Sequence, residues 1–179
     1  MKKDARPAAD AGHIVPDLLA PDLKLVMCGT ALGRVSAREK AYYANPGNQF
    51  WQAVHRIGLT PRRLHPKEYP GMLELGIGLT DLCKTAFGND DELPDGAFDR
   101  DALIRKIEQF QPSVLAFTSK TGGQFFLGRK LEYGLQEDRI GDTTIYVCCS
   151  PSGRARRFWQ ENVWEGLAAL VNEAEPKTS

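Results

Sequence analysis

Four short apolar runs, separated by segments with helical periodicity, constrain the fold of this chain more than any other feature. The runs cover residues 25–28, 75–80, 113–118 and 144–149. Strands that are apolar at almost every position are typical of parallel sheets with helices on both faces. We therefore predict an α/β fold with a mostly parallel central sheet, in which ligands bind at the loops that leave the carboxyl ends of the strands.

Capping residues, prolines and glycines set the boundaries of the predicted helices. The helices are expected over residues 45–58, from residue 60 onward, over residues 99–112 and over residues 158–171. In the first helix Asn45 is the expected N-cap and Pro46 the first helical residue. Asp99 is the expected N-cap of the third, which carries an apolar stripe toward the sheet.

The chain of 179 residues is long enough for one sizeable core, so residues 15–175 are predicted to form a single domain after a flexible tail at 1–14. No apolar run approaches the roughly 20 residues that cross a bilayer, so we expect a cytoplasmic protein without membrane contact. The cysteines at 28, 83, 148 and 149 lack the spacing of metal sites and are expected to be buried, reduced thiols. Neither a metal nor a nucleotide cofactor is expected, because complete G-x-G-x-x-G and P-loop motifs are also missing.

Basic and acidic residues are equal in number, at 23 each, but their distribution along the chain is uneven. Basic side chains flank the loops that follow residues 29 and 150, whereas acidic ones gather between residues 90 and 101. A basic face opposite an acidic one would suit a nucleic-acid partner. A mixed, solvated surface is an equally good interpretation of the charge pattern alone.

Five segments, in order along the chain, resemble the mismatch-specific uracil/thymine-DNA glycosylases of the uracil-DNA glycosylase superfamily. They are residues 14–21, the loop Cys28-Gly29-Thr30-Ala31-Leu32-Gly33, residues 43–51, residues 78–81 and Ser150-Pro151-Ser152-Gly153. The resemblance implies a three-layer α/β/α sandwich that flips a damaged pyrimidine nucleotide out of DNA and hydrolyses its N-glycosidic bond without a metal.

The loop at residues 28–33 corresponds to the family's first motif. The same resemblance implies that the flipped base stacks on Tyr43 and bonds to the backbone amides of this motif. The implied base pocket comprises Gly29, Thr30, Ala31, Tyr43, Asn45 and Ser150. The alternative for Tyr43 is a ring that faces the core, as one of an adjacent pair of tyrosines.

The first motif departs from the family's usual Gly-Ile-Asn-Pro-Gly, with Ala31 in place of the Asn that positions water and Leu32 in place of the Pro. A methyl group cannot orient water, so either the activity is lost or another residue provides this function. Bond cleavage passes through a cationic sugar, which favours a nearby carboxylate. Asp81, directly after a predicted strand, is therefore the expected catalytic residue; the alternative is that it caps the following turn.

The segment that starts at Ser150 corresponds to the family's second motif. In the family this motif usually begins with Asn or His and carries a Leu that wedges into the duplex. Here Ser150 stands at the first position and Arg154 at the position of the wedge. Arg154 is expected either to fill the vacated stack or to contact phosphates. The other expected DNA contacts are Lys120, Ser152, Gly153, Arg156 and Arg157.

From these observations we expect a monomeric glycosylase that associates with nucleoid DNA and releases uracil from single-stranded or mismatched DNA in base excision repair. Mismatched thymine and other damaged pyrimidines belong to the expected substrate range. Three alternatives stay open: a glycosylase for hypoxanthine or another deaminated purine, a catalytically silent protein that binds damaged DNA, and a small-molecule α/β enzyme. The arginine-rich loop at 154–157 argues against the last.

Overall fold

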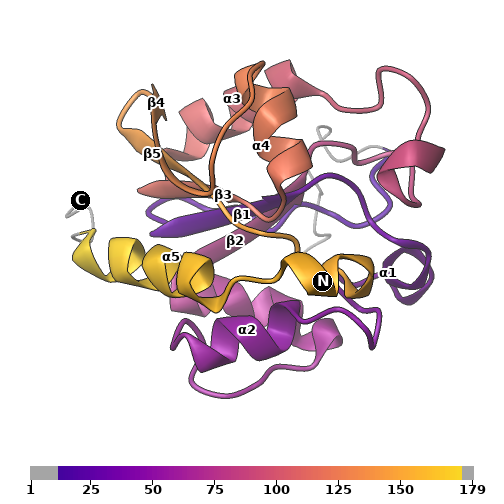
Figure 1. The fold of residues 1–179 in the computed structure, drawn as a ribbon, viewed down its shortest axis with the longest axis horizontal. Coiled ribbons are helices and arrows are strands. Elements are labelled where there is room, and N and C mark those ends of the chain that lie inside the picture. The colour runs from indigo at the N-terminus through magenta and orange to yellow at the C-terminus, as the bar shows by residue number, and fades with distance from the viewer. Residues whose placement is uncertain (1–11, 175–179) are drawn as a thin grey trace, which may run out of the picture.

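A computed structural model describes residues 12–174, in which a five-stranded sheet lies between two layers of helices (Figure 1). The strands are β1 (Leu25–Gly29), β2 (Ile77–Asp81), β3 (Val114–Phe117), β4 (Gly134–Ile140) and β5 (Thr143–Val147). Their order is β2-β1-β3-β5-β4, and only the pair β4 and β5 is antiparallel. The predicted α/β class with a mostly parallel central sheet is confirmed.

Helices cover both faces of this sheet. The α-helices are α1 (Arg34–Glu39), α2 (Phe50–Arg56), α3 (Arg100–Phe110), α4 (Lys120–Leu127) and α5 (Glu161–Glu173). Three 3₁₀ helices join them: η2 (Pro66–Leu75), η3 (Asp90–Glu92) and η4 (Gly153–Phe158). Figure 1 shows α3 and α4 on one face and α2 and α5 on the other, which gives the expected three layers.

Strand β1 shows why the sheet needs both helical layers. Successive side chains of a strand point to opposite faces. Leu25 and Met27 pack in the core that contains α2 and α5, whereas Val26 and Cys28 pack in the core that contains α3 and α4. Every residue of β1 is buried, which is the physical origin of its uninterrupted apolar sequence.

The predicted start of the first long helix is wrong. Asn45 and Pro46 lie in a turn, where Asn45 Oδ1 accepts a hydrogen bond from the Gly47 amide (2.9 Å). Helix α2 begins only at Phe50. An Asn side chain that bonds two residues ahead closes a turn, and here this local bond replaces the expected N-cap.

The helical segment expected from Thr60 also begins later. Thr60 Oγ1 instead donates to the Arg62 carbonyl (2.8 Å), and the chain becomes helical at Pro66. His65 and Glu68 then cap the start of η2: the His65 Nδ1 accepts from the Lys67 amide (3.2 Å), and the Glu68 carboxylate accepts from the His65 amide (2.7 Å). Such a paired cap determines the helix start more strongly than a proline alone.

Two further differences lie near the C-terminal half. Phe158 and Trp159 precede α5, which begins at Glu161, and Phe158 ends η4 with 55% of its surface exposed. The sequence did not predict β4, because its side chains alternate between half-buried and exposed at the sheet edge and include several polar residues. The Asp99 cap of α3 is confirmed, since its carboxylate accepts from the Ala102 amide (2.9 Å).

Most of the predicted tail, and residue 175 at the predicted domain end, lie outside the described residues. Within the tail, the Ile14 amide already donates to the Lys84 carbonyl (3.0 Å). Across residues 12–174, no helix has the length and apolar character needed to span a membrane. The same residues contain no cluster of three His, Cys, Asp or Glu side chains that could hold a metal ion.

Candidate active site

The carboxyl ends of the parallel strands meet at one edge of the sheet, where a cavity of about 830 Å³ opens. We call it the main cavity. It is lined by residues 29–36, 42, 43, 45, 48, 81, 88–91, 118, 119, 121, 150–155 and 158. The loops expected to bind ligand after β1, β2, β3 and β5 therefore come together around one space.

Asp81 ends β2 beside Gly29 of β1 and is only 4% exposed. Its Oδ2 has no hydrogen-bond partner among the described residues, and the Lys84 ammonium lies 3.9 Å away. Burial raises the pKa of Asp81 to about 6, and the positive charge of Lys84 opposes this rise. The carboxylate is therefore charged at neutral pH and becomes protonated in mildly acidic solution.

Gly29 allows this carboxylate to reach the cavity wall. A Cβ atom at position 29 would lie 2.5 Å from Asp81 Oδ1 and 3.2 Å from the Tyr43 hydroxyl. Both distances are shorter than an ordinary contact, so only glycine fits between the two side chains. A backbone hydrogen bond from Gly29 also favours the charged form of Asp81.

Tyr43 forms the adjoining wall and is held on two sides. Its ring stacks on Phe50, with centroids 3.9 Å apart and planes inclined by 13°. Its hydroxyl lies 3.0 Å from Thr118 Oγ1 at the end of β3. Burial, followed by the negative charge of Asp81, raises the pKa of Tyr43 well above its ordinary value, so the phenol stays neutral. The ring lines the main cavity and also packs against the core, which combines the two interpretations considered for it.

Acidic residues lie at the mouth of the same cavity as Arg154. Asp90 Oδ1 accepts a hydrogen bond from Thr30 Oγ1 (2.6 Å), and Glu92 pairs with Arg34 (2.7 Å). Because Asp90 and Arg154 both line the main cavity, these acidic residues do not form a separate face opposite the basic loops. Their contacts instead fix the loop that carries the first motif.

The second motif forms the opposite side of the mouth. Ser150 Oγ accepts from the Ser152 amide (3.2 Å), and Ser152 Oγ accepts from the Arg154 amide (3.3 Å). A Cβ at Gly153 would lie 3.0 Å from the Gly47 carbonyl oxygen, so the loop approaches the 43–48 turn closely. The Gln49 amide also donates to the Pro151 carbonyl (2.8 Å), and this bond holds the two loops together at the cavity rim.

The expected DNA contacts separate into two groups. Ser152, Gly153 and Arg154 line the main cavity. Lys120, Arg156 and Arg157 do not line it: Lys120 lies over the Tyr133 ring (4.5 Å), Arg156 donates to the Gly47 carbonyl (3.2 Å), and Arg157 lies over Phe158 (4.7 Å). The expected base-pocket residues, including Ala31, Asn45 and Ser150, all line the cavity.

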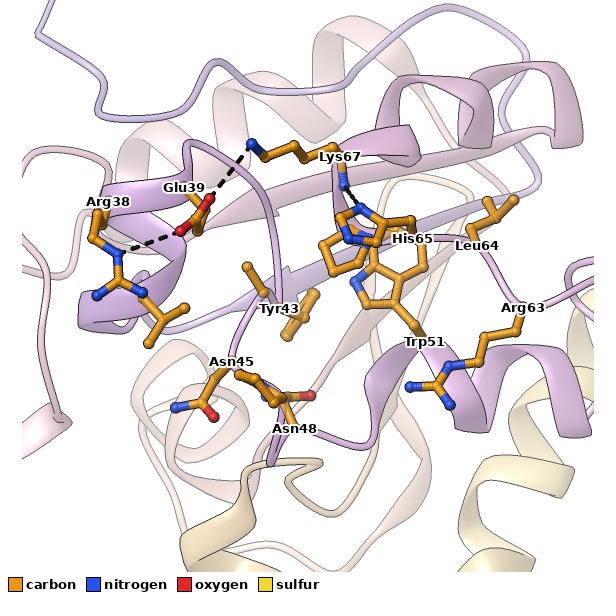
Figure 2. Close-up of a pocket in the computed structure, with 14 residues that line it drawn as sticks. Arg38, Glu39, Tyr43, Asn45, Asn48, Trp51, Arg63, Leu64, His65 and Lys67 are labelled. Atoms are coloured by element: carbon orange, nitrogen blue, oxygen red, sulfur yellow. Dashed lines mark hydrogen bonds and ion pairs between the residues drawn. The ribbon is translucent and has the colours of Figure 1, made fainter.

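A second cavity, of about 560 Å³, shares the 43–48 turn with the main cavity (Figure 2). We call it the side cavity. Figure 2 shows Arg38 and Arg63 on opposite sides of it, with Trp51 between the turn and His65. Glu39 pairs with Arg38 (3.4 Å) and with Lys67 (3.5 Å) at its rim.

Sequence reasoning missed three features of the site. Thr118 holds the Tyr43 hydroxyl, Phe158 exposes its ring at the cavity mouth, and Lys84 adds a buried charge behind Asp81. Lys84 had a sequence signal, because it follows Asp81 by three residues in an otherwise apolar segment. Thr118 and Phe158 had no comparable local signal.

Comparisons with known proteins identify a family that matches this chain and a solved structure with a similar fold. The profile of the uracil DNA glycosylase superfamily matches residues 16–170, a range that includes every segment lining the main cavity. A solution NMR structure of a candidate uracil DNA glycosylase from Methanosarcina acetivorans is similar, with a TM-score of 0.61 and 21% identity over 89% of this chain and 97% of that chain. At this identity the likeness to the solved structure concerns the fold.

Proposed function

This chain belongs to the uracil DNA glycosylase superfamily, and we propose that it is a mismatch-specific uracil-DNA glycosylase that works without a metal or nucleotide cofactor. The superfamily supports a hydrolytic enzyme that acts on DNA. Our proposal adds the substrate, which is uracil and other damaged or mismatched pyrimidines, and the acting residues. The observation that carries it is the buried Asp81 carboxylate, which lines the main cavity and whose Oδ2 lacks a hydrogen-bond partner among the described residues.

A base must leave the duplex to reach Asp81, because this residue is almost completely buried. Extrusion costs a few kcal/mol of stacking and pairing, and it costs least at a mismatch. The Tyr43 ring, backed by Phe50, offers a rigid wall on which a flipped base can stack. Mismatched uracil is therefore the favoured substrate in this proposal.

In the proposed reaction, water attacks C1′ of the sugar while the bond between C1′ and the base nitrogen breaks. Asp81 accepts a proton from the water, and its charge stabilises the cationic sugar. The base leaves with the bonding electron pair, and backbone amides of Thr30 and Ala31 stabilise the resulting anion. Solvent then protonates the base, so the products are the free base and an abasic site.

Two observations each support an alternative function. A cavity of about 830 Å³ is large enough for a purine as well as a pyrimidine, which favours a glycosylase for hypoxanthine. Ala31 lines the cavity without a polar group, which favours a catalytically silent protein that binds damaged DNA. Asp81 supports catalysis over the silent alternative, since mere binding has no need of a buried carboxylate.

One assay separates these functions. The protein is incubated with oligonucleotides that carry uracil or hypoxanthine, as single strands and opposite each base, and abasic sites are cleaved with alkali. We expect cleavage at uracil in the presence of EDTA, faster in single strands and opposite a mismatched base than opposite adenine. Cleavage only at hypoxanthine would support the purine enzyme, and damaged-DNA binding without cleavage would support the silent protein.

A further inference from the structure

Behind Asp81 lies a group of buried charged side chains that the proposed reaction does not use directly. Asp17, from the segment before β1, and Lys84, from the turn after β2, have side chains that are 8% and 7% exposed. Lys106 of α3 is 18% exposed and completes the group. Charges so far from water are costly unless they are paired and held in place.

Lys84 lies between two carboxylates and bonds mainly to one of them. Its Nζ is 3.1 Å from Asp17 Oδ1 and donates to the Tyr42 hydroxyl (2.8 Å). The same Nζ is 3.9 Å from Asp81 Oδ2, too far for a hydrogen bond. Lys84 therefore acts on Asp81 through its charge, while Asp17 and Tyr42 determine its position.

Asp17 is anchored from two other elements. Lys106 Nζ lies 2.7 Å from its Oδ2, and Thr80 Oγ1 donates to its Oδ1 (2.7 Å). Burial opposes the charge of Asp17, but Lys84 and Lys106 together hold the pKa of this carboxyl below its ordinary value. The group thus links the N-terminal segment, β2, the following turn and α3 at the back of the site.

We propose that Lys84 is a positioning residue for the reaction, whose ammonium, held by Asp17, keeps the Asp81 carboxylate charged and available to water. This inference rests on the proposed role of Asp81. Lys84 has no contact with the substrate in this arrangement. Asp17 works in the opposite sense, since it draws the ammonium away from Asp81 and adds a second negative charge.

The groups that face Asp81 come from every element around it. Lys84 and Lys106 favour its charged form, Asp17 disfavours it, and the Gly29 backbone bonds to it. Cys28, Tyr42 and Tyr43 also lie close, but burial raises the pKa of all three well above the ordinary value, so they stay neutral. The charge of Asp81 at neutral pH thus depends on the balance between Lys84 and Asp17.

Two variants with opposite expected effects test this balance. An acid-side loss of single-turnover excision is expected as pH falls through about 6, because Asp81 must be deprotonated to accept a proton. In Lys84→Met this loss should move to higher pH by about one unit, which is about a tenfold lower rate well below the wild-type midpoint. In Asp17→Asn it should move to lower pH. Lys84→Arg should restore the wild-type profile, and Lys130→Met, which removes an exposed cation outside the main cavity, should leave it unchanged.

A measurement without DNA separates this inference from the proposed function. The titration of Asp81 is followed by ¹³C NMR of labelled aspartate carboxyls, with the signal assigned from its absence in Asp81→Asn. We expect the Asp81 midpoint to rise in Lys84→Met and fall in Asp17→Asn, whether or not the protein excises a base. If Lys84→Met does not fold, Asp17→Asn and Lys84→Arg decide the question. An Asp81 midpoint that does not fall in Asp17→Asn, or that does not rise in folded Lys84→Met, would overturn the inference.

Discussion

The main cavity and the side cavity share the turn at residues 43–48, yet they differ in what lies at their inner ends. The main cavity reaches a buried carboxylate whose Oδ2 lacks a hydrogen-bond partner among the described residues. The side cavity reaches Trp51, whose Nε1 already donates to the Tyr42 carbonyl (3.0 Å), and Glu39 pairs with Arg38 and Lys67 on the exposed rim.

This difference indicates where chemistry is to be expected. A buried carboxylate without full compensation lowers the stability of the fold, so its presence points to a function. Solvated ion pairs such as Glu39 with Lys67 contribute little to stability and can occur on any surface. Size alone would not have separated the two cavities, since each is large enough for a nucleotide base.

The largest expected effect follows from Asp81→Asn. This change keeps the size of the side chain but removes the charge, so single-turnover excision of uracil should fall about 10²-fold or more. Binding to DNA with an abasic-site analogue, measured by fluorescence anisotropy, should survive. Asp91→Asn at the cavity mouth is the matched control and should change the rate by no more than about twofold, because a solvated carboxylate contributes little.

Ala31→Asn sharpens the same test, because it restores the amide that the family uses to hold water. In the Asp81→Asn background it should recover part of the excision rate if the two positions face one water. Full activity of folded Asp81→Asn would end the assignment of the main cavity's carboxylate as the catalytic group.

The next largest effect is expected from Gly29→Ala. The new methyl would lie 2.5 Å from Asp81 Oδ1, so the carboxylate must move. Misplacing a reacting group by such amounts can cost up to about 10²-fold in rate, and overpacking of this kind typically costs about 1–3 kcal/mol of stability. Excision rate and melting temperature are the two measurements.

Gly33→Ala is the matched control for this variant. Gly33 lies in the same loop and has φ of −72°, and apart from its chain neighbours no atom lies within 4 Å of the place that a methyl group would take there. Wild-type activity and melting temperature are expected. Equal losses in the two variants would mean that the loop as a whole, and not the contact with Asp81, needs glycine.

Tyr43→Ala is expected to have an intermediate effect. Loss of a stacking ring costs about 1–3 kcal/mol per base, so base excision should fall by about 5- to 150-fold. Tyr43→Phe keeps the ring on Phe50 and loses only the contact with Thr118, so it should reduce activity mildly. Equal, severe losses in both variants would identify the hydroxyl as the acting group.

The smallest effects are expected on DNA affinity, in variants at the rims of the main cavity and the side cavity. Arg154→Ala, at the mouth of the main cavity, should weaken DNA binding. It should also reduce the slope of log Kd against log salt concentration by about 1, which corresponds to the loss of one phosphate contact. Arg63→Ala, which changes only the side cavity, should leave affinity and salt dependence unchanged. A loss in Arg63→Ala as large as that in Arg154→Ala would show that DNA also passes over the side cavity.

The positions of β1, β2, β3 and β5, and the place of Asp81 at the end of β2, could be predicted because the signals are local. An apolar run has to be buried wherever it lies, and the residue after it emerges at the sheet edge. Helix starts were less predictable. Asn45 and Thr60 each have a competing side-chain bond to nearby backbone, and the bond that forms depends on how the turn docks on its neighbours.

The sequence by itself determined the α/β class, the sheet edge that carries the site, and the absence of a polar group at position 31. Only the tertiary structure decided which arginines face the cavity, that Thr118 meets Tyr43 across 75 residues of chain, and that Lys84 lies between Asp17 and Asp81. The physical reason is the separation along the chain of the residues that each property depends on. Strand formation depends on neighbouring residues, whereas the charge state of a buried carboxylate depends on side chains that only the packing of distant segments brings within a few ångströms.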